Sequence, residues 1–336
     1  MAKNSEFYNP NSAAYYNPAE ERKTALVTGG NLGIGWYTVL HLYLHGYIVY
    51  VAGRNDEKVT QAIQEIEAEA EKRTGEYSEL ELKRKPLGQL WSLHLDCCDL
   101  GSVEKCAETF FTKESHLDVL INNAGVMAVP YEMTKDGYEI QYQVNLVAPI
   151  LLTTKLLPAL ENAAAKSSMP RAITLSSIGH RMSLKYWDPA DPINKFPSAA
   201  YSWVRYGNAK RGAIEYMRKF AQEHRNMLAF SVHPGVITDT RLYDYWIHLP
   251  AIGPLFKLGF QGCGRVMGVS CEEGSFATLR AALDPELGPE QSGSYLVTGG
   301  SIEEPSSIAQ KQENIDSTWY YNMRLLTEKG FLKAAL

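Results

Sequence analysis

Residues 25–35 read Ala25-Leu-Val-Thr28-Gly29-Gly30-Asn31-Leu32-Gly33-Ile34-Gly35, and this stretch decides the fold. A short apolar run, typical of a buried strand, leads into a glycine-rich turn and then into an apolar-periodic helix. In a dinucleotide-binding turn, glycines let the backbone approach a pyrophosphate, and the helix N-terminus presents free amide donors. The sequence therefore predicts a phosphate site made by Gly29, Asn31, Leu32, Gly33, Ile34 and Gly35.

Six further apolar runs follow along the chain and alternate with helix-period segments. The seven expected strands are 25–28, 48–52, 90–96, 119–122, 172–176, 229–233 and 294–297. This alternation predicts a single α/β domain of the doubly wound Rossmann type, with a seven-stranded, mainly parallel sheet flanked by helices. We expect the domain to span residues 23–300, after an N-terminal arm at 1–22 and before a C-terminal helical tail at 301–336.

Composition narrows the class of protein. The 336 residues are 45% hydrophobic and carry a net charge of -5, so nothing indicates a nucleic-acid partner. The five cysteines form no C-x-x-C pair, so neither a disulfide framework nor a metal site is expected, and a reducing, cytoplasmic location fits best. The first 22 residues lack the basic and apolar regions of a signal peptide.

The end of the second strand indicates the cofactor. A site for NAD usually places an acidic residue there, whereas this chain has Arg54, whose guanidinium suits the 2′-phosphate of NADP. Asp56 lies further on, and we interpret it as the N-cap of the next helix. Asp96, at the end of the third strand, is either a partner of the adenine amino group or a solvated strand end.

Two Tyr-x-x-x-Lys matches occur, Tyr131–Lys135 and Tyr206–Lys210, and chance alone produces such matches in a chain with 20 tyrosines. In a helix either pair would share one face. Position favours the second pair, because Ser177 ends the fifth strand at the carboxyl edge of the sheet, where ligands bind, and Tyr206 comes next along the chain. A ketone that accepts a hydride needs a proton donor and a second hydrogen-bond donor at its oxygen.

Taken together, the motifs resemble the short-chain dehydrogenase/reductase family over about residues 23 to 300. They are Thr28-Gly29-x-x-x-Gly33-x-Gly35, Asn122-Asn123-Ala124-Gly125, Asn145, Ser177 and Tyr206-x-x-x-Lys210. The resemblance implies that Tyr206 exchanges a proton with the substrate and that Lys210 lowers the Tyr206 pKa and binds the nicotinamide ribose. It also implies that Ser177 polarises the carbonyl, that Asn145 holds a water, and that Asn123, Ala124 and Gly125 wall the cofactor site.

One part of the family pattern is altered. Pro234 and Gly235 resemble the turn beside the nicotinamide carboxamide, but the usual threonine five places after the proline is Asp239. Thr238 and Thr240 flank it, and the sequence does not choose between them.

Two segments bear on the substrate. The 28 residues between Ser177 and Tyr206 include Trp187, Phe196 and Trp203, and such an insertion either roofs the site or forms an ordinary packed loop. Residues 242–269 are rich in aromatics, but proline and glycine interrupt them, so they cannot span a bilayer. They form either a peripheral contact with a lipid surface or only a substrate lid.

Several stretches resemble a narrower subgroup, the retinol-dehydrogenase-like enzymes, and most closely the fungal lipid-droplet oxidoreductases. They include 30–37, 122–130, 133–137 and 176–180. This resemblance implies an NADP(H)-dependent enzyme for lipophilic alcohols or carbonyls, such as retinoids, steroids or lipid aldehydes, at a lipid-droplet or endomembrane surface. A homodimer is left open. The alternatives are a catalytically silent NADP-sensing or scaffold protein and an epimerase of nucleotide sugars.

Overall fold

The computed structural model describes residues 7–166, 169–184, 199–237, 244–248, 253 and 268–333. Its central sheet has the strand order β10-β9-β6-β5-β4-β1-β2-β3. The strands are β1 Thr24–Thr28, β2 Ile48–Gly53, β3 Gln89–His94, β4 Val119–Asn122, β5 Arg171–Leu175, β6 Leu228–Val232, β9 Tyr295–Leu296 and β10 Ile302–Glu303. Every pairing is parallel except that of β9 with β10. The predicted doubly wound Rossmann fold is confirmed.

The expected number of strands was too small. All seven predicted strands are present, but β10 adds an eighth at the edge of the sheet, and β7 Val236–Ile237 and β8 Gly268–Val269 pair in a separate ribbon. These elements are two residues long, too short to give a period in the sequence. Strand order reverses beside β1, where β2 and β4 lie on opposite sides of it. Ligands of open α/β sheets bind at such a point, beyond the carboxyl ends of the strands.

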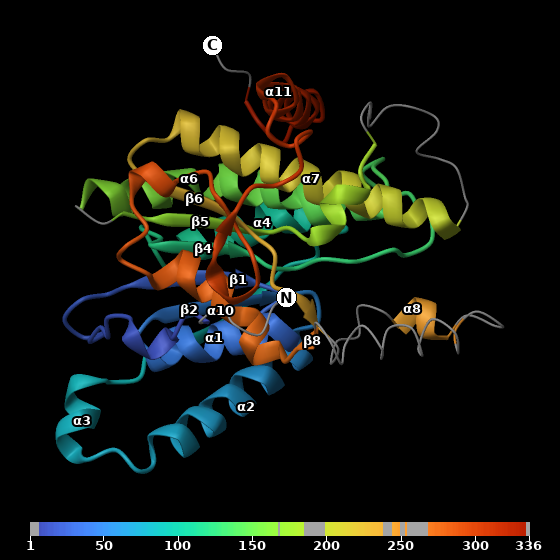
Figure 1. The fold of residues 1–336 in the computed structure, drawn as a ribbon. Helices are drawn as coiled ribbons and strands as arrows, with labels where there is room; N and C mark the ends of the chain where they lie inside the picture. The colour runs from blue at the N-terminus through green and yellow to red at the C-terminus, as the bar shows by residue number, and fades with distance from the viewer. Residues whose placement is uncertain are drawn as a thin grey trace.

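Helices cover both faces of the sheet (Figure 1). One face carries α1 Gly33–Leu44, α2 Asp56–Thr74 and α10 Cys271–Leu283, and the other carries α4 Leu100–Phe111, α6 Ala148–Ala165 and α7 Ala199–Glu223. The shorter elements are α3 Glu79–Arg84, α5 Ile140–Tyr142, α8 Asp244–Ile247, the 3-10 helices Pro10–Ser12, Ile178–Met182, Pro289–Gln291 and Thr298–Gly300, and the π-helical turn Gln143–Val147.

The core lies in two layers, one on each face of the sheet. Successive strand residues alternate between them: Leu26 packs with α4, α6 and α7, whereas Val27 packs with α1 and α10. Because side chains of a strand point alternately to its two faces, a sheet covered on both sides needs continuous apolar strands. This is why the inner strands β1, β2, β4, β5 and β6 appear in the sequence as mostly apolar runs, whereas the edge strand β3 is largely exposed.

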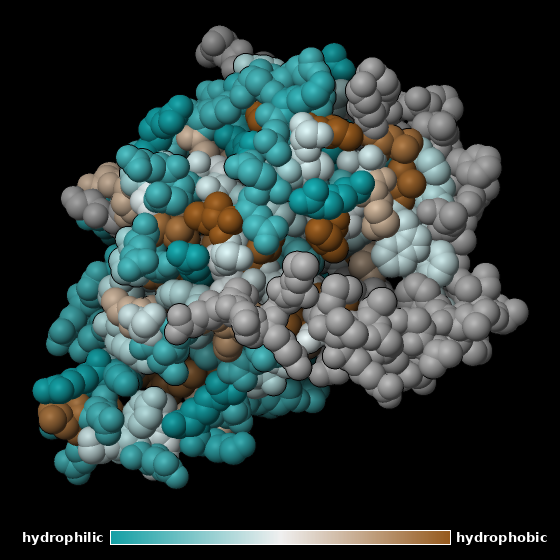
Figure 2. All heavy atoms as spheres, viewed as in Figure 1, coloured by the Kyte–Doolittle hydropathy of each residue, from teal (hydrophilic) through white to brown (hydrophobic). Residues whose placement is uncertain are grey.

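The charged stretch between β2 and β3 forms α2, which packs on the sheet, and α3, which has no buried residue and lies at the outer end of α2 (Figure 1). We expected Asp56 to be the N-cap of α2, and this was wrong. Asn55 caps the helix by accepting a hydrogen bond from the Lys58 amide, and the Asp56 carboxylate contacts His94 instead. The surface of these two helices is mostly hydrophilic, with hydrophobic atoms at the end of α3, where Leu80 and Leu82 are exposed (Figure 2).

Two segments outside 23–300, the described part of the N-terminal arm and helix α11, pack on the domain. Helix α11, Gln312–Glu328, lies against α7, where the rings of Tyr216 and Trp319 stack with centroids 5.2 Å apart. In the N-terminal arm, the Tyr8 amide donates to the Gly299 carbonyl. One helical stretch of the described chain, Ile140–Ala165, is long and apolar enough to cross a membrane, but 78% of its most apolar window is buried inside the protein.

Candidate functional site

The glycine-rich turn after β1 has the backbone that a close approach to phosphate requires. Gly29 and Gly33 have φ values of 63° and 56°, a region that favours glycine. A Cβ on Gly35 would lie 2.2 Å from the Gly29 carbonyl oxygen, so only glycine lets α1 start this close to the turn. Leu32 is the N-cap of α1 and makes no side-chain hydrogen bond there. The first amides of α1 are therefore open to an anion.

Strand β4 supports this turn through a set of hydrogen bonds. The Thr28 hydroxyl oxygen accepts from the amides of Asn123 and Ala124, at 3.0 and 2.9 Å. The Asn123 side-chain amide donates back to the carbonyls of Thr28 and Gly29, at 2.8 and 3.1 Å. Asn123 and Ala124 of the predicted wall are thus tied directly to the glycine-rich turn.

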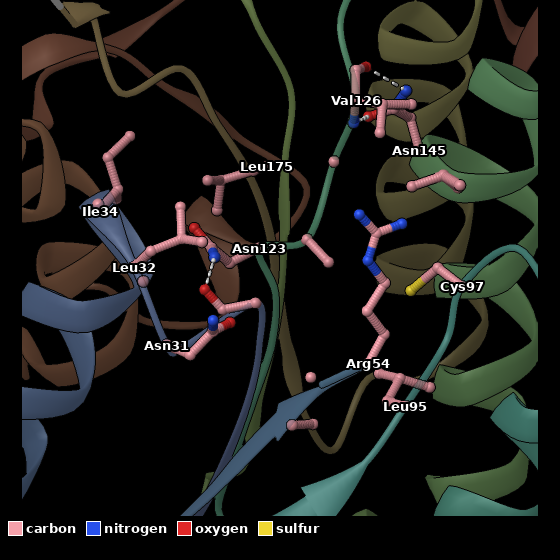
Figure 3. A pocket seen from close by; sticks show the side chains of 18 of the residues that line it. Asn31, Leu32, Ile34, Arg54, Leu95, Cys97, Asn123, Val126, Asn145 and Leu175 are labelled. Atoms are coloured by element: carbon pink, nitrogen blue, oxygen red, sulfur yellow. Dashed lines mark hydrogen bonds between the residues drawn. The ribbon is translucent and has the colours of Figure 1, made fainter. Parts of the chain in front are cut away.

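A cavity of about 320 Å³ lies at the carboxyl ends of the strands (Figure 3). It is lined by almost all residues that the sequence analysis selected: Gly29, Asn31, Leu32, Gly33, Ile34, Gly35, Arg54, Asp96, Asn123, Ala124, Gly125, Asn145, Tyr206, Lys210 and Pro234. Residues that were predicted from five strand ends and two helices therefore line one cavity. Ser177 and Gly235 lie outside this lining.

Arg54 extends from the end of β2 into the cavity, across from the turn that carries Asn31, Leu32 and Ile34 (Figure 3). Its side chain is exposed, and Asp96 on the neighbouring strand end is partly buried. One oxygen of Asp96 accepts from the Cys98 amide at 2.9 Å. Burial raises the pKa of the Cys98 thiol to about 11, so this cysteine on the cavity wall stays protonated at neutral pH.

Asn145 lies in the π-helical turn Gln143–Val147, between α5 and α6, and is 1% exposed. Its amide nitrogen donates to the Val126 carbonyl at 2.8 Å, and its oxygen accepts from the Val126 amide (Figure 3). The same nitrogen also donates to the Gln141 carbonyl at 2.9 Å. A Cβ on Gly125 would lie 2.7 Å from the Asn145 oxygen and 3.5 Å from Lys210 Nζ. Gly125 therefore lies between Asn145 and Lys210, and a side chain at position 125 would crowd both residues.

Lys210 is 5% exposed, and its ammonium donates to the Leu175 carbonyl at 2.7 Å. Nζ also lies 5.7 Å from the centroid of the Tyr206 ring. Burial lowers the pKa of Lys210 from its usual 10.5 to about 7, because the charged form loses its hydration. The lysine beside Tyr206 thus changes charge near neutral pH.

This lowered pKa predicts how stability depends on pH. Between about pH 7 and 10.5 the unfolded chain holds one more proton at Lys210 than the folded protein, so the free energy of unfolding rises with pH. We expect Lys210→Met to stabilise the cofactor-free protein by roughly 2–4 kcal/mol below pH 7, net of the lost hydrogen bond, and the gain to vanish near pH 10.5. Urea unfolding at a series of pH values measures it.

The matched control for this prediction is Lys105→Met, which replaces an exposed lysine of α4. It should leave the free energy of unfolding within about 0.5 kcal/mol of wild type. A Lys210→Met difference that is constant or grows between pH 7 and 10.5 would show that the buried lysine is not uncharged there.

Tyr206 lines the cavity and packs against the turn that follows Ser177, whereas Ser177 itself does not line the cavity. A Cβ on Gly179 would lie 2.8 Å from the Tyr206 ring, so the turn after Ser177 packs against the tyrosine. Ser177 follows β5 by two residues and caps the 3-10 helix Ile178–Met182, where its hydroxyl oxygen accepts from the Gly179 amide at 3.0 Å. The hydroxyl hydrogen is left to donate elsewhere.

Buried His180 fixes the backbone of this turn. The Ser306 amide donates to Nε2 at 2.9 Å, and since an amide only donates, Nδ1 carries the proton and donates to the Ser177 carbonyl at 2.7 Å. Burial lowers the pKa of His180, which keeps the ring neutral. Sequence reasoning did not single out this residue, because its role depends on Ser306, over 120 positions away.

The second Tyr-x-x-x-Lys match does not form a helical pair. Tyr131 and Lys135 lie in the loop after β4, contrary to the expectation that either pair would share a helix face. Lys135 pairs with Asp99 at 2.6 Å, and the Tyr131 ring lies under Arg205. Neither residue lines the cavity.

Several residues that the sequence analysis considered as contacts of the cofactor or as covers of the substrate site lie outside the described part of the chain. They are Thr238, Asp239, Thr240, Trp187, Phe196 and most of 242–269.

Other residues line the cavity but were not predicted from the sequence: Ala52, Gly53, Leu95, Cys98, Val126, Val144, Leu175, Ser176 and Cys271. Those next to strand ends could have been predicted, because the carboxyl ends of parallel strands meet at one edge of the sheet. Cys271 could not, because only the packing of α10 on α1 brings it to the glycine-rich turn.

Comparison with known proteins agrees with this geometry. The profile of the short chain dehydrogenase family matches residues 23–188. The short-chain dehydrogenase/reductase drtF of Aspergillus calidoustus is 30% identical over 331 residues, which cover 94% of this chain and 97% of the relative. The chain belongs to the short-chain dehydrogenase/reductase family. The resemblance recognised in the sequence is therefore confirmed at the level of the family.

Other relatives in the short-chain dehydrogenase/reductase family include enzymes named for lipophilic alcohols. Mouse retinol dehydrogenase 12 is 30% identical, covering 90% of this chain and 86% of its own, and human polyprenol dehydrogenase is 30% identical, covering 80% and 75%. Among solved structures, a protein of Mycobacterium paratuberculosis matches with a TM-score of 0.67 at 23% identity, covering 95% of this chain and 97% of its own. Pseudomonas aeruginosa RhlG, solved as an NADP active-site complex, matches with a TM-score of 0.60 at 18% identity, covering 83% and 95%. These structures support the fold.

Proposed function

We propose that this oxidoreductase transfers a hydride between NADP(H) and a lipophilic alcohol or carbonyl, with Tyr206 as the general acid and base. The observation that carries the proposal is the single cavity that holds the phosphate turn, Arg54 and the Tyr206–Lys210 pair together. The names of the retinol and polyprenol relatives support a lipophilic substrate. Retinoids, steroids and long-chain aldehydes are the classes to try first.

The residues present fit a dinucleotide. A Cβ on Gly35 would fill the cradle beside Gly29, and the uncapped start of α1 offers amides to the pyrophosphate. Arg54 would pair with a 2′-phosphate, Asp96 would accept from the adenine, and Pro234 would border the nicotinamide end. When bound, NADPH supplies the hydride.

The chain's own residues would manage the proton. Tyr206 would donate its phenol proton to the substrate oxygen during reduction and accept one during oxidation. Lys210, which titrates near neutral pH, would hold positive charge beside the phenol and favour its ionised form. Ser177 would donate its free hydroxyl hydrogen to the substrate carbonyl, and Asn145 would hold a water near Lys210.

Replacement of Arg54 tests the choice of cofactor. Arg54→Ala should raise the Kd for NADPH about 10- to 100-fold, because a charge-assisted pair with the 2′-phosphate is lost, and should change the Kd for NADH little. Fluorescence titration of both nucleotides measures this. Arg324→Ala, on the exposed face of α11, is the matched control. Equal losses for NADPH and NADH would remove the proposed preference.

A catalytically silent NADP-sensing or scaffold protein is the alternative from another class. A sensor needs the phosphate turn and Arg54, but has no use for Tyr206 and Lys210 in contact beside the same cavity. Attachment to a lipid droplet or endomembrane through 242–269 stays a proposal, as does a homodimer. Flotation with lipid droplets that is lost on deleting residues 249–260 would support the attachment, and unchanged flotation would exclude it.

A further inference from the structure

Gln141 is a fully buried residue that does not line the cavity but is hydrogen-bonded near two catalytic candidates, Tyr206 and Asn145. It lies in α5, one turn before Asn145, and its exposed fraction is 0%. No motif in the sequence marks it. A buried side-chain amide is costly unless its donors and acceptor are paired, so its partners indicate why it is present.

Both ends of the Gln141 side chain are paired. Its oxygen accepts from the Ala128 amide at 2.7 Å, and its nitrogen donates to the Ser202 carbonyl at 3.0 Å. The Ala128 amide only donates and the Ser202 carbonyl only accepts, so the two partners fix the orientation of the side chain. Gln141 therefore links the loop after β4 to helix α7.

Ser202 lies one turn before Tyr206 on α7, so its carbonyl is the one that α-helical geometry pairs with the Tyr206 amide. The Gln141 main chain reaches the other side of the site, because the Asn145 side chain donates to the Gln141 carbonyl at 2.9 Å. One residue is thus bonded both to the helical turn that carries Tyr206 and to the side chain of Asn145.

Ala128, whose amide donates to the Gln141 side chain, has a strained backbone. Its φ of 50° makes it the one non-glycine residue in the left-handed region among those the structure describes. Such a conformation costs about 1 kcal/mol or more and persists only where its surroundings hold it. Gln141 holds the Ala128 amide, and the Trp246 indole donates to its carbonyl at 2.8 Å. Ala128 and Trp246 pack in the same buried cluster as Tyr206.

We propose that Gln141 is a positioning residue, which sets Tyr206 relative to Asn145 and Lys210 by holding the Ala128 loop against the first turns of α7. The inference rests on the proposed function of the same site. Without the amide, Ala128 relaxes toward an ordinary φ and the turn that carries Tyr206 shifts. The cofactor end of the cavity, built on β1, β2 and α1, keeps its shape.

The substitution Gln141→Glu tests this with a readout that depends on protonation. The carboxyl keeps the acceptor for the Ala128 amide, and in its protonated form it keeps a donor for the Ser202 carbonyl. Once ionised, it repels that carbonyl. Burial raises the pKa of the new carboxyl, as it raises that of the adjacent Glu139, and an ionised Glu139 raises it further, whereas Arg205, 3.3 Å from Glu139, lowers it.

We expect the ratio of the variant's kcat to that of wild type to fall at least about tenfold between pH 5 and pH 8, as the carboxyl ionises. The NADPH Kd should stay within about twofold of wild type at both pH values. Gln89→Glu, on the exposed surface of β3, is the matched control and should show a constant ratio. A constant ratio for Gln141→Glu, with only a lower melting temperature, would overturn the positioning role.

A second variant covers the case in which Gln141→Glu does not fold. Gln141→Met removes both side-chain hydrogen bonds without adding charge, and its kcat should fall at least about tenfold at every pH, with NADPH still bound. A kcat equal to that of wild type would overturn the inference. If wild type itself shows no carbonyl-dependent oxidation of NADPH, the proposed function fails and this inference fails with it.

Discussion

Tyr206→Phe should lower kcat by about 10²- to 10⁴-fold, because the substrate oxygen then has no proton donor at the point where it becomes an alkoxide. The phenylalanine keeps the ring that packs on Met127, Ala128 and Trp246. The site should therefore keep its shape, and the NADPH Kd should stay within about threefold of wild type. Steady-state kinetics and a nucleotide titration on the same preparation measure both quantities.

The chain provides a matched control for this experiment in its other Tyr-x-x-x-Lys match. Tyr131→Phe makes the same chemical change at a loop residue that does not line the cavity, and kcat should stay within about twofold of wild type. Retained turnover in Tyr206→Phe, or an equal loss in Tyr131→Phe, would remove Tyr206 from the role of general acid.

Gly35→Ala should raise the Kd for NADPH by at least about 100-fold. A methyl group at this position would lie 2.2 Å from the Gly29 carbonyl oxygen, which is main chain and cannot swing away. The start of α1 must then move off the turn, and the amides that face the pyrophosphate lose their alignment. Because both nucleotides share the pyrophosphate, the Kd for NADH should rise with that for NADPH, unlike the result expected for Arg54→Ala.

The control for Gly35→Ala is Gly288→Ala, where the backbone is extended and the nearest atom to a new Cβ is 3.7 Å away. Thermal unfolding of both variants shows whether the loss of affinity comes from the turn or from general instability. NADPH affinity like that of wild type in a folded Gly35→Ala protein would contradict the assignment of this turn to the phosphates.

The sequence was sufficient for features that depend on local pattern. Apolar runs predicted the strands, most of which are buried on both faces of the sheet, and the predicted turn at 29–35 lines the cavity. Two Tyr-x-x-x-Lys pairs have the same spacing, so spacing could not choose between them. The position of Tyr206 and Lys210 after Ser177 in the chain selected the pair that lines the cavity. Arg54 was selected because strand ends in a parallel sheet meet at one edge.

Features that arise from tertiary packing were not predictable in this way. The two-residue strands β7, β8 and β10 have no period to detect, and Asn55 rather than Asp56 caps α2 because of local geometry. The π turn that contains Asn145 has no sequence signature, and the buried hydrogen bonds of Gln141 and His180 join segments far apart in the chain. Polar residues of this kind look like ordinary helix residues until their partners are in place.

We propose that the cavity is a redox site for NADP(H) rather than a nucleotide sensor. The most direct test of this claim follows the nicotinamide absorbance of NADPH while wild-type protein is mixed with retinoid, steroid and long-chain aldehyde carbonyls, with NADH as the comparison. We predict that NADPH is oxidised only when a carbonyl from this panel is present, and faster than NADH. Tight binding of NADPH with no oxidation by any of these carbonyls would contradict the claim and favour the sensor.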